Sequence, residues 1–320
     1  MKKYHILNDN NEEVFDIDLF NQAVKDGTVV TTNSVSGGQT SAYIAKHYPA
    51  DYNIFSLVRT DDPKLMFPDK KLRQMVSDKI GREFIGTMEE NKIIHTIMDL
   101  EQYIGREITW LTGPSFDEII DMKIGLPNGT QRYCTSMMKI EPMSQWHYEN
   151  IGEPTLTRIG FRVTEQRRAH NMLNKCNEEG LVVIKVKIGK HKSGRNKWMD
   201  YRWQMPDFPL TKDGIRKDDI VEFWKGKPVR FAWRNNCVGC LHRNPILLNH
   251  ISKKFPDKFQ WFIDQEKAAA KRVPPKKNGQ PSSYARFREE FSYEQIKNHK
   301  TQLELFDSDF NDCDSGYCGL

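Results

Sequence analysis

Long apolar runs and a strong excess of one charge are both missing from this 320-residue sequence. No apolar run is long enough to cross a bilayer, and the N-terminal MKKYHILNDNNEEVFD lacks the apolar block of a signal peptide. We therefore expect a cytoplasmic protein with no membrane partner. Lys and Arg number 48 against 43 Asp and Glu, and this net charge of +5 is too small to identify a polyanionic substrate.

Cysteine is also scarce, with six residues in the chain. In a reducing cytosol cysteines seldom form structural disulfides, so we expect free thiols, metal ligands or redox groups. Cys237 and Cys240 form a C-x-x-C pair, whose spacing suits two thiolates on one metal or cluster. For Cys176 we expect a buried free thiol.

The two common glycine fingerprints of phosphate sites do not describe the glycine pair Gly37-Gly38. This loop has neither the lysine of G-x-x-x-x-G-K-[ST] nor the spacing of G-x-G-x-x-G. It reads SGGQTS and lies between an apolar run, TVVTTNSV, and the helix-like AYIAKHY. Two glycines let backbone amides approach an anion, and Ser36, Thr40 and Ser41 add hydroxyl donors at a positive helix end. A plain turn or helix cap is the alternative.

Strands alternate with helices along most of the chain, which indicates an α/β fold with a mainly parallel, twisted sheet and helices on both faces. The first strand, loop and helix are followed by an apolar run at 53–59, so a β-α-β unit is complete within about 30 residues. Further strands are expected at 108–112, 155–163 and 181–189. Helices are expected at 71–81, 164–176 and from 213 onward.

Residues 1–27 are expected to form a short helical preface. Residues 266–320 are expected to form a C-terminal extension. It contains a Pro- and Lys-rich linker at 271–283, a charged helix at 285–299 and an acidic, cysteine-containing tail that we expect to be mobile.

Four blocks, in order, carry a resemblance to a known family. SGGQTS resembles the SGG-x-[TD]-S pyrophosphate loop of the PP-loop superfamily, the adenine nucleotide alpha-hydrolases. RYCTSMMKIEP at 132–142 and IGFRVTEQRR at 159–168 are similar to the R-x-C-x-x-x-x-K-x-x-P and G-[IL]-R-x-x-E-x-x-R segments of phosphoadenosine phosphosulfate (PAPS) reductase-like proteins. FPLTKDGIRKDDIVEFW, followed by NNCVGC, resembles their C-x-x-C region. The resemblance implies a PP-loop domain over residues 28–265.

The resemblance also implies an adenine nucleotide, ATP or PAPS, with Mg²⁺. Cations would face the reacting phosphate or sulfate, and the candidates are Lys139, Arg162 and Arg168, each of which is otherwise an ordinary surface ion pair. Asp61 and Asp62 either reach the base, ribose or Mg²⁺ or cap a helix. The expected nucleotide-binding residues are Ser36, Gly37, Gly38, Gln39, Thr40, Ser41, Thr60, Asp61, Asp62, Gly160 and Glu165. Glu165 either orients the arginines or lies in solvent.

Cys134 stands in the block that supplies cysteine ligands in iron-sulfur members of the family, so the implied metal ligands are Cys134, Cys237 and Cys240. A [4Fe-4S] cluster is the first expectation and zinc the second. The family's paired cysteines are replaced here by Tyr133-Cys134. A fourth ligand could therefore be an exogenous sulfur or one of Cys176, His242, Cys313 and Cys318.

The terminal YCGL resembles the C-terminal E-C-G-L-H of sulfonucleotide reductases, which implies Cys318 as a nucleophile, although the Glu and the His are missing. Cys313 could form a disulfide with Cys318, or both could complete a metal site. The basic and aromatic stretch 189–203 could bind nucleic acid, but the weak overall charge favours a solvated loop with buried tryptophans.

Three functions remain open. The first is an ATP pyrophosphatase that adenylylates a nucleic-acid or small-molecule acceptor, with sulfur transfer to follow. The second is a sulfonucleotide reductase that forms sulfite and draws on a thiol reductant protein. The third is a nucleotide-binding subunit without catalysis. The intact SGGQTS loop favours the first.

Overall fold

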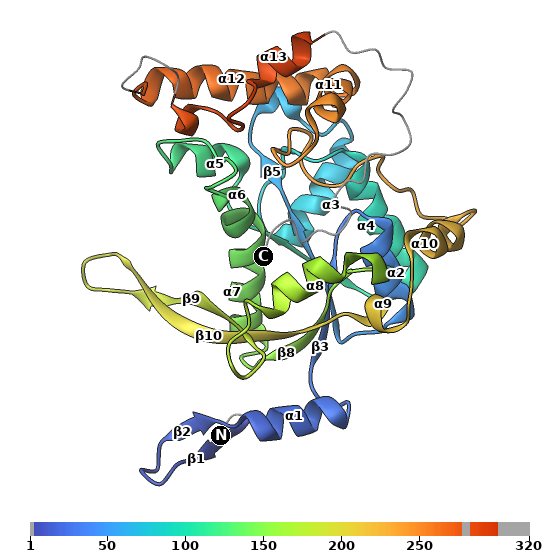
Figure 1. Ribbon diagram of the computed structural model, residues 1–320, viewed down its shortest axis with the longest axis vertical. Helices are drawn as coiled ribbons and strands as arrows, with labels where there is room; N and C mark the ends of the chain where they lie inside the picture. Colours follow the sequence, from blue (N-terminus) through green and yellow to red (C-terminus); the bar gives the residue numbers. More distant parts are fainter. Residues whose placement is uncertain (1–2, 277–281, 300–320) are drawn as a thin grey trace.

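The computed structural model describes residues 3–276 and 282–299, and its largest sheet has six strands in the order β7-β4-β3-β8-β10-β9 (Figure 1). All neighbouring strands are parallel except β10 and β9, which are antiparallel. The predicted α/β fold with a mainly parallel sheet is therefore confirmed. The strands are β3 (Thr31–Val35), β4 (Tyr52–Leu57), β7 (Ile108–Thr112), β8 (Thr155–Arg158), β9 (Val182–Lys190) and β10 (Asn196–Asp207).

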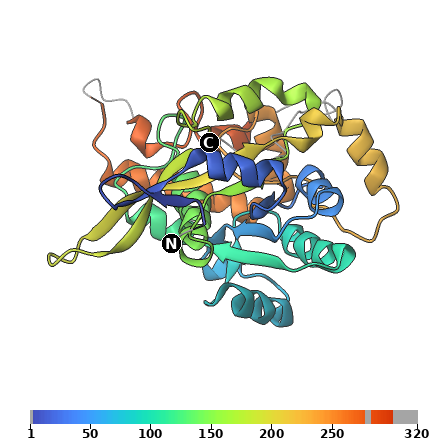
Figure 2. The same cartoon turned by 90° about the horizontal axis from the view of Figure 1, so that it is seen from below.

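Helices cover both faces of this sheet, because successive residues of a strand point to opposite sides (Figure 2). Phe55 packs in one apolar cluster, whereas its neighbour Ile54 packs in another. The first cluster contains side chains of α2 (Gln39–His47), α3 (Lys70–Ile80), α4 (Lys92–Ile104) and α10 (Lys217–Trp224). The second contains side chains of α7 (Glu141–Asn150) and α8 (Gln166–Leu173).

The N-terminal part has the expected helix, α1 (Ile17–Lys25), which begins where the Asp16 side chain accepts hydrogen bonds from the amides of Asp18 and Leu19. A hairpin precedes it that the sequence analysis did not predict. The remaining short elements are β1 (His5–Leu7), β2 (Glu13–Phe15), β5 (Arg59–Thr60), η1 (Pro63–Leu65), β6 (Gly86–Thr87), α6 (Tyr133–Thr135), the π-helical η2 (Ser136–Ile140), η3 (Val163–Glu165) and α9 (Pro209–Lys212).

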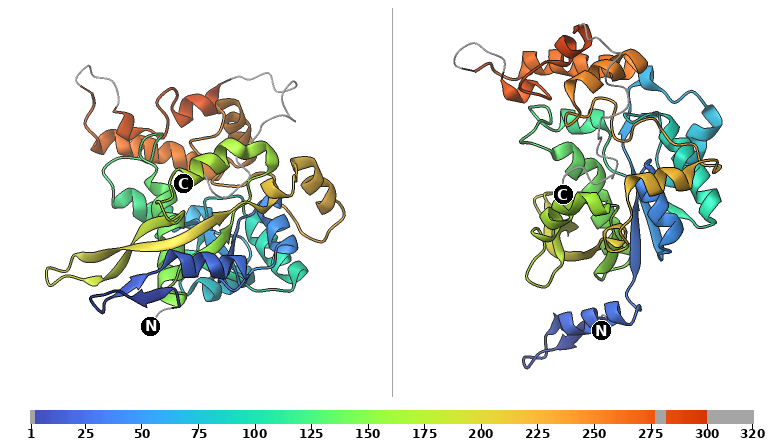
Figure 3. Two further views of the ribbon diagram at one scale, coloured as in Figure 1. Left: turned by 60° about the horizontal axis from the view of Figure 1, so that its bottom comes forward. Right: turned by 45° about the vertical axis from the view of Figure 1, so that its right-hand side comes forward.

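Helices gather at one end of the molecule, where α11 (Pro245–Lys254), α12 (Pro256–Arg272) and α13 (Tyr293–Asn298) pack with α5 (Phe116–Asp121) in one apolar cluster (Figures 1 and 3). The boundary expected at residue 265 falls inside α12, a continuous helix. The charged helix expected at 285–299 is wrong in extent. A short 3₁₀ turn, η4 (Ser283–Ala285), comes first, and the helix begins only after Ser292, whose side chain accepts from the Gln295 amide.

The solvated loop expected at 189–203 is also wrong. Residues 189–190 of this stretch belong to β9 and residues 196–203 to β10, and these two strands pair as an antiparallel ribbon that extends away from the sheet (Figure 1). Trp203 is fully buried, as expected, but Trp198 is 47% exposed. Throughout residues 3–276 and 282–299, no helix is both long enough and apolar enough to span a membrane.

Candidate functional site

The glycine loop connects the C-terminal end of β3 to the N-terminus of α2. Hydrogen bonds within the loop close it. The Ser36 and Ser41 hydroxyl groups form one between their Oγ atoms at 2.9 Å, and the Ser36 amide donates to Ser41 Oγ at 2.9 Å. The Gly38 amide donates to Ser36 Oγ at 3.3 Å. Helix α2 has no side-chain cap at Gly38, so no cap side chain satisfies the first amides of this nine-residue helix.

Two glycines allow the loop to pack this closely. A Cβ atom on Gly37 would lie 2.6 Å from Ile93 Cγ1, and one on Gly160 would lie 3.1 Å from Thr40 Cγ2. The Trp224 indole donates to the Gln39 carbonyl at 3.0 Å and fixes the start of α2 from the other side. The loop is therefore held by three separate segments of the chain.

A small cavity of about 20 Å³ lies beneath the loop. Its polar lining includes Ser34, Ser36, Ser56, Glu89, Lys139, Asn235 and Asn236. A cavity of this size has room for about one water molecule. A nucleotide would therefore lie on the outer side of the loop, or the cavity would have to open to admit its phosphates.

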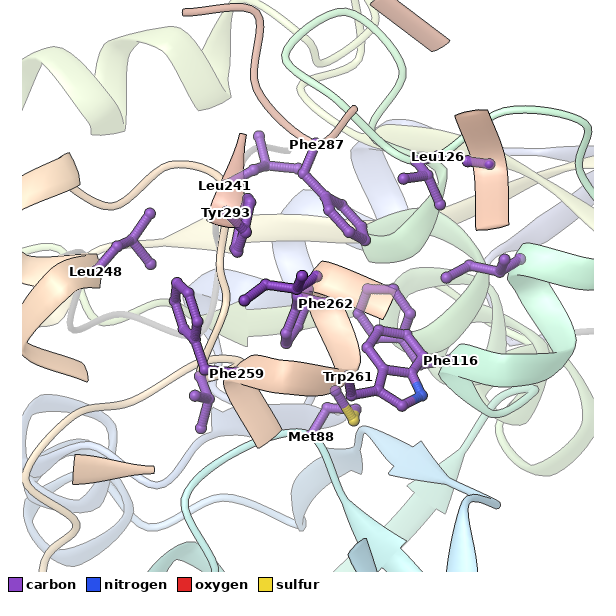
Figure 4. Packing of buried hydrophobic residues seen from close by; sticks show 14 of the residues in the cluster. Met88, Phe116, Leu126, Leu241, Leu248, Phe259, Trp261, Phe262, Phe287 and Tyr293 are labelled. Atoms are coloured by element: carbon purple, nitrogen blue, oxygen red, sulfur yellow. The ribbon is translucent and has the colours of Figure 1, made fainter. Parts of the chain in front are cut away.

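The three cysteines expected to act as ligands line a second cavity, of about 50 Å³. Lys139 and Asn236 line this cavity as well as the cavity beneath the loop, so the two cavities share a wall. Most of the remaining lining is apolar and includes Phe116, Phe262 and Phe287, which come from α5, from α12 and from the segment before α13 (Figure 4). The structure thus brings Cys134 together with Cys237 and Cys240 beside the glycine loop.

The C-x-x-C pair lies in a tight turn. The Cys240 amide donates to the Cys237 carbonyl at 3.0 Å, and the Val238 amide donates to the Met88 carbonyl at 2.8 Å. A Cβ atom on Gly239 would lie 2.5 Å from the Phe262 ring, so glycine is needed where the turn crosses that side chain. Cys134 lies in α6, next to the π-helical turn η2, and π-turns occur frequently at functional sites.

Three thiols and one imidazole line this cavity. Over the described residues, no group of three or more His, Cys, Asp or Glu side chains is arranged to hold one metal ion, although the three thiols line one cavity. Burial raises the pKa of Cys134 to about 11 and also raises that of Cys237, which lies near Glu89. Burial lowers the pKa of His242 to about 4, so its imidazole is neutral and able to act as a ligand on the same cavity.

Cys176, another candidate for the fourth ligand, does not line this cavity. Cys176 follows α8, packs in the apolar cluster of that face and donates to the Met172 carbonyl at 3.7 Å. Burial raises the pKa of Cys176, as expected for a free thiol away from cations. Cys313 and Cys318 lie outside the described residues, so the role expected for Cys318 stays a prediction.

An ion pair between Lys139 and the buried Glu89 lies where the two cavities meet. Lys139 Nζ lies 3.0 Å from Glu89 Oε1, and Glu89 is 3% exposed. Within the described part of the chain, Glu89 Oε2 is buried without a hydrogen-bond partner. Lys258 donates to the Glu89 carbonyl and, at 2.7 Å, to Asn91 Oδ1. Burial lowers the pKa of Lys258 to about 8.

The sequence analysis missed Glu89, Lys258 and the amides Asn235 and Asn236. The two asparagines directly precede the C-x-x-C pair, and this position next to expected ligands is the signal that could have identified them. Glu89 has no comparable signal, because its partner Lys139 is distant in sequence.

The two expected arginines share one carboxylate. Arg162 Nε donates to Glu165 Oε2 at 2.9 Å, and Arg168 Nη1 donates to Glu165 Oε1 at 2.5 Å. Arg168 also lies 4.7 Å from the centre of the Phe161 ring. Glu165 therefore orients both arginines. Neither arginine is among the described residues that line the two cavities, where Lys139 is the expected cation.

The residues after β4 make local structural contacts. Thr60 Oγ1 donates to Asp117 Oδ2 at 2.7 Å, and Asp61 accepts from Arg59 at 2.9 Å. Asp62 accepts from the Lys64 amide at 2.9 Å and caps η1, which is the structural alternative foreseen for it. The structure brings none of these three into the walls of the two cavities.

No protein-family model matches this chain, and no curated protein sequence matches it. The function must therefore be inferred from the residues themselves and from their geometry.

Proposed function

We propose that the chain is a PAPS reductase-like PP-loop enzyme that binds an adenine nucleotide at the loop Ser36–Ser41. It cleaves ATP between the α and β phosphates and adenylylates an acceptor, in preparation for sulfur transfer. The observation that supports this proposal is the shared wall, in which Lys139 and Asn236 line both the loop cavity and the thiol cavity. An anion-binding loop beside thiol groups suits sulfur transfer to an adenylylated acceptor.

In the proposed reaction, an oxygen or nitrogen of the acceptor attacks the α-phosphorus. The bond to the bridging oxygen breaks, pyrophosphate leaves with the electron pair, and the acceptor loses a proton to solvent. The uncapped amides of α2 favour the negative charge of the phosphates. Lys139 adds a positive charge on the thiol side, and such cations stabilise charge that develops on the leaving group. Mg²⁺ would enter as its complex with ATP.

A [4Fe-4S] cluster would be held by Cys134, Cys237 and Cys240, with His242 available on the same cavity. When bound, such a cluster would supply an iron site that can carry sulfur or electrons. Apolar side chains form most of the cavity wall beside the thiols, and Phe262 packs against the turn between Cys237 and Cys240.

Pyrophosphate release from ATP tests the proposal. We expect the anaerobically purified chain to release pyrophosphate from ATP and Mg²⁺, and we expect a loss of about a hundredfold when the shared lysine is removed. The variant is Lys139→Met combined with Glu89→Gln, because the second change avoids a buried unpaired carboxylate. The matched control is Lys79→Met with Glu101→Gln. It removes an ion pair of similar length, 2.9 Å between Lys79 Nζ and Glu101 Oε1, whose residues line neither cavity.

Equal loss of activity in both double variants would contradict the role of Lys139. Sulfite formed from PAPS, with no pyrophosphate from ATP, would favour the sulfonucleotide reductase. Nucleotide binding with neither product would favour the non-catalytic subunit.

A further inference from the structure

The outer part of the ribbon β9–β10 concentrates the positive charge of the chain. This segment, residues 185–199, is called the arm below. It carries six Lys or Arg residues and no Asp or Glu, and all six cations are exposed: Lys185, Lys187, Lys190, Lys192, Arg195 and Lys197. Because the chain has a net charge of +5, the residues outside the arm carry a net charge of −1. The arm is therefore an element that carries positive charge alone, and Figures 1 and 3 show that the ribbon projects from the sheet.

No internal contact accounts for these cations. None of the six makes an ion pair within the described part of the chain, whereas Arg202, nearer the sheet, is paired with Glu179 at 2.7 Å. Asp200 is the nearest carboxylate along β10 and lies opposite Lys185. Six adjacent cations repel one another, and a polyanion relieves that repulsion.

The arm also presents an exposed aromatic ring. Trp198 is 47% exposed and lies opposite Lys187, so the indole and this ammonium group share one face of the ribbon. An exposed indole beside cations suits an unpaired base, which stacks on the ring while its phosphates contact the cations.

The adjoining groove continues this face toward the body of the protein. It has a volume of about 840 Å³ and is lined by Lys185, Lys187 and Trp198 of the ribbon. Carboxylates also line this groove, including Glu141 and Glu149 of α7, so a phosphate chain is favoured beside the cations of the ribbon. The Gln145 side chain exchanges two hydrogen bonds with the Lys187 backbone, at 2.8 and 2.9 Å, and braces the base of the arm against α7.

We propose that the arm binds a single-stranded nucleic acid, with phosphates along its six cations and an unpaired base on Trp198. Binding at the arm does not depend on adenylylation at the glycine loop.

Fluorescence anisotropy with labelled oligonucleotides of about 15 nucleotides tests this. Single-stranded DNA, single-stranded RNA and duplex DNA are compared at several salt concentrations. The arm variant replaces Lys190, Lys192, Arg195 and Lys197 by Gln. The matched control replaces four other exposed cations by Gln, at Lys64, Lys70, Lys71 and Lys217.

We expect the arm variant to bind a single strand at least tenfold more weakly than wild type. The slope of log affinity against log salt concentration should become shallower by about 3. The control variant should change neither quantity. Trp198→Ala should weaken single-strand binding about 5- to 100-fold with little change in the slope. Comparison of DNA with RNA then identifies which nucleic acid binds better.

Three results would overturn the proposal: an equal loss in the control, no binding to any oligonucleotide at low salt, or unchanged binding in Trp198→Ala. If a polyglutamate competitor displaces the single strand only from wild type, and Trp198→Ala has no effect, the arm instead recognises an acidic protein. All variants change exposed side chains, and equal melting temperatures would show that the fold is kept.

Discussion

At the residue scale, Gly37 decides how closely the glycine loop approaches α4. The Ile93 side chain fills the space in which any Cβ atom at this position would lie. The need for glycine here is therefore steric and comes from a residue far away in the sequence.

We predict that Gly37→Ala lowers the free energy of unfolding by about 1–3 kcal/mol and weakens ATP binding, because it overpacks this contact. In an Ile93→Ala background, Gly37→Ala should lower the free energy of unfolding much less, because the side-chain atoms that would collide with the new methyl group are absent. Denaturant unfolding and ATP titration measure both effects. Gly129→Ala, where a Cβ atom meets nothing within 4 Å, is the control and should have little effect.

The ion pair between Lys139 and Glu89 leads to a second prediction at this scale. Lys139→Met alone should destabilise the fold by about 3 kcal/mol, because it leaves a buried carboxylate without its cation. Adding Glu89→Gln should restore most of that loss. If the single and double variants unfold at the same denaturant concentration, the two side chains are not coupled in solution.

Lys139 was predicted as a site residue through the resemblance, but Glu89 was not. A lysine inside a motif can be recognised from its neighbours in sequence. The carboxylate that faces it comes from the turn before α4, and only the packing of that turn against the helix at 133–150 makes the pair.

At the scale of elements, α12 carries a buried carboxylate that ties it to the following segment. Glu266 is 7% exposed and accepts hydrogen bonds from the amides of Phe287 and Tyr293, at 3.2 and 2.8 Å. Burial raises the pKa of Glu266 to about 7, although the two amides act in the opposite direction.

This pKa gives the packing of α12 a defined dependence on pH. The folded state holds the proton up to about pH 7, whereas the unfolded chain releases it near 4.5. The stabilisation is therefore complete below about pH 4.5 and is lost as the pH rises through 7. Between pH 4.5 and pH 7, the free energy of unfolding of wild type should fall by about 3 kcal/mol more than that of Glu266→Gln. Urea unfolding at several pH values measures this difference.

The control for this experiment is Glu222→Gln, which changes an exposed carboxylate on α10. Its stability curve should run parallel to that of wild type. Parallel curves for Glu266→Gln as well would mean that Glu266 is not the group responsible. Burial lowers the pKa of His147 to about 4, so this residue destabilises the folded state as the pH falls, opposite to Glu266. The stability of each variant is therefore compared with that of wild type at the same pH.

At the scale of the whole molecule, separate apolar clusters hold the N-terminal part and the C-terminal helices. Phe20 is the fully buried centre of the first, with Tyr4, Val29 and Leu181. Phe262 belongs to the second and lines the thiol cavity. The two phenylalanines are equally buried but lie in different parts of the fold.

We predict that Phe20→Ala and Phe262→Ala each lower the free energy of unfolding by about 3–5 kcal/mol. Only Phe262→Ala should speed the labelling of Cys134, Cys237 and Cys240 by a thiol reagent in the folded, metal-free protein, because it removes part of the cavity wall. The labelling rate for each cysteine is followed by mass spectrometry. Equal acceleration in Phe20→Ala would mean that labelling follows global unfolding and not the local cavity.

The sequence by itself determined the features that depend on near neighbours. The alternation of strands and helices and the glycine loop before α2 follow from apolar period, turn chemistry and backbone freedom within a few residues. Tertiary structure alone decided which distant segments meet. The assembly of three thiols on one cavity, the Glu89–Lys139 wall and the extension of the basic stretch into a ribbon depend on strand order and packing, and no local pattern encodes those contacts.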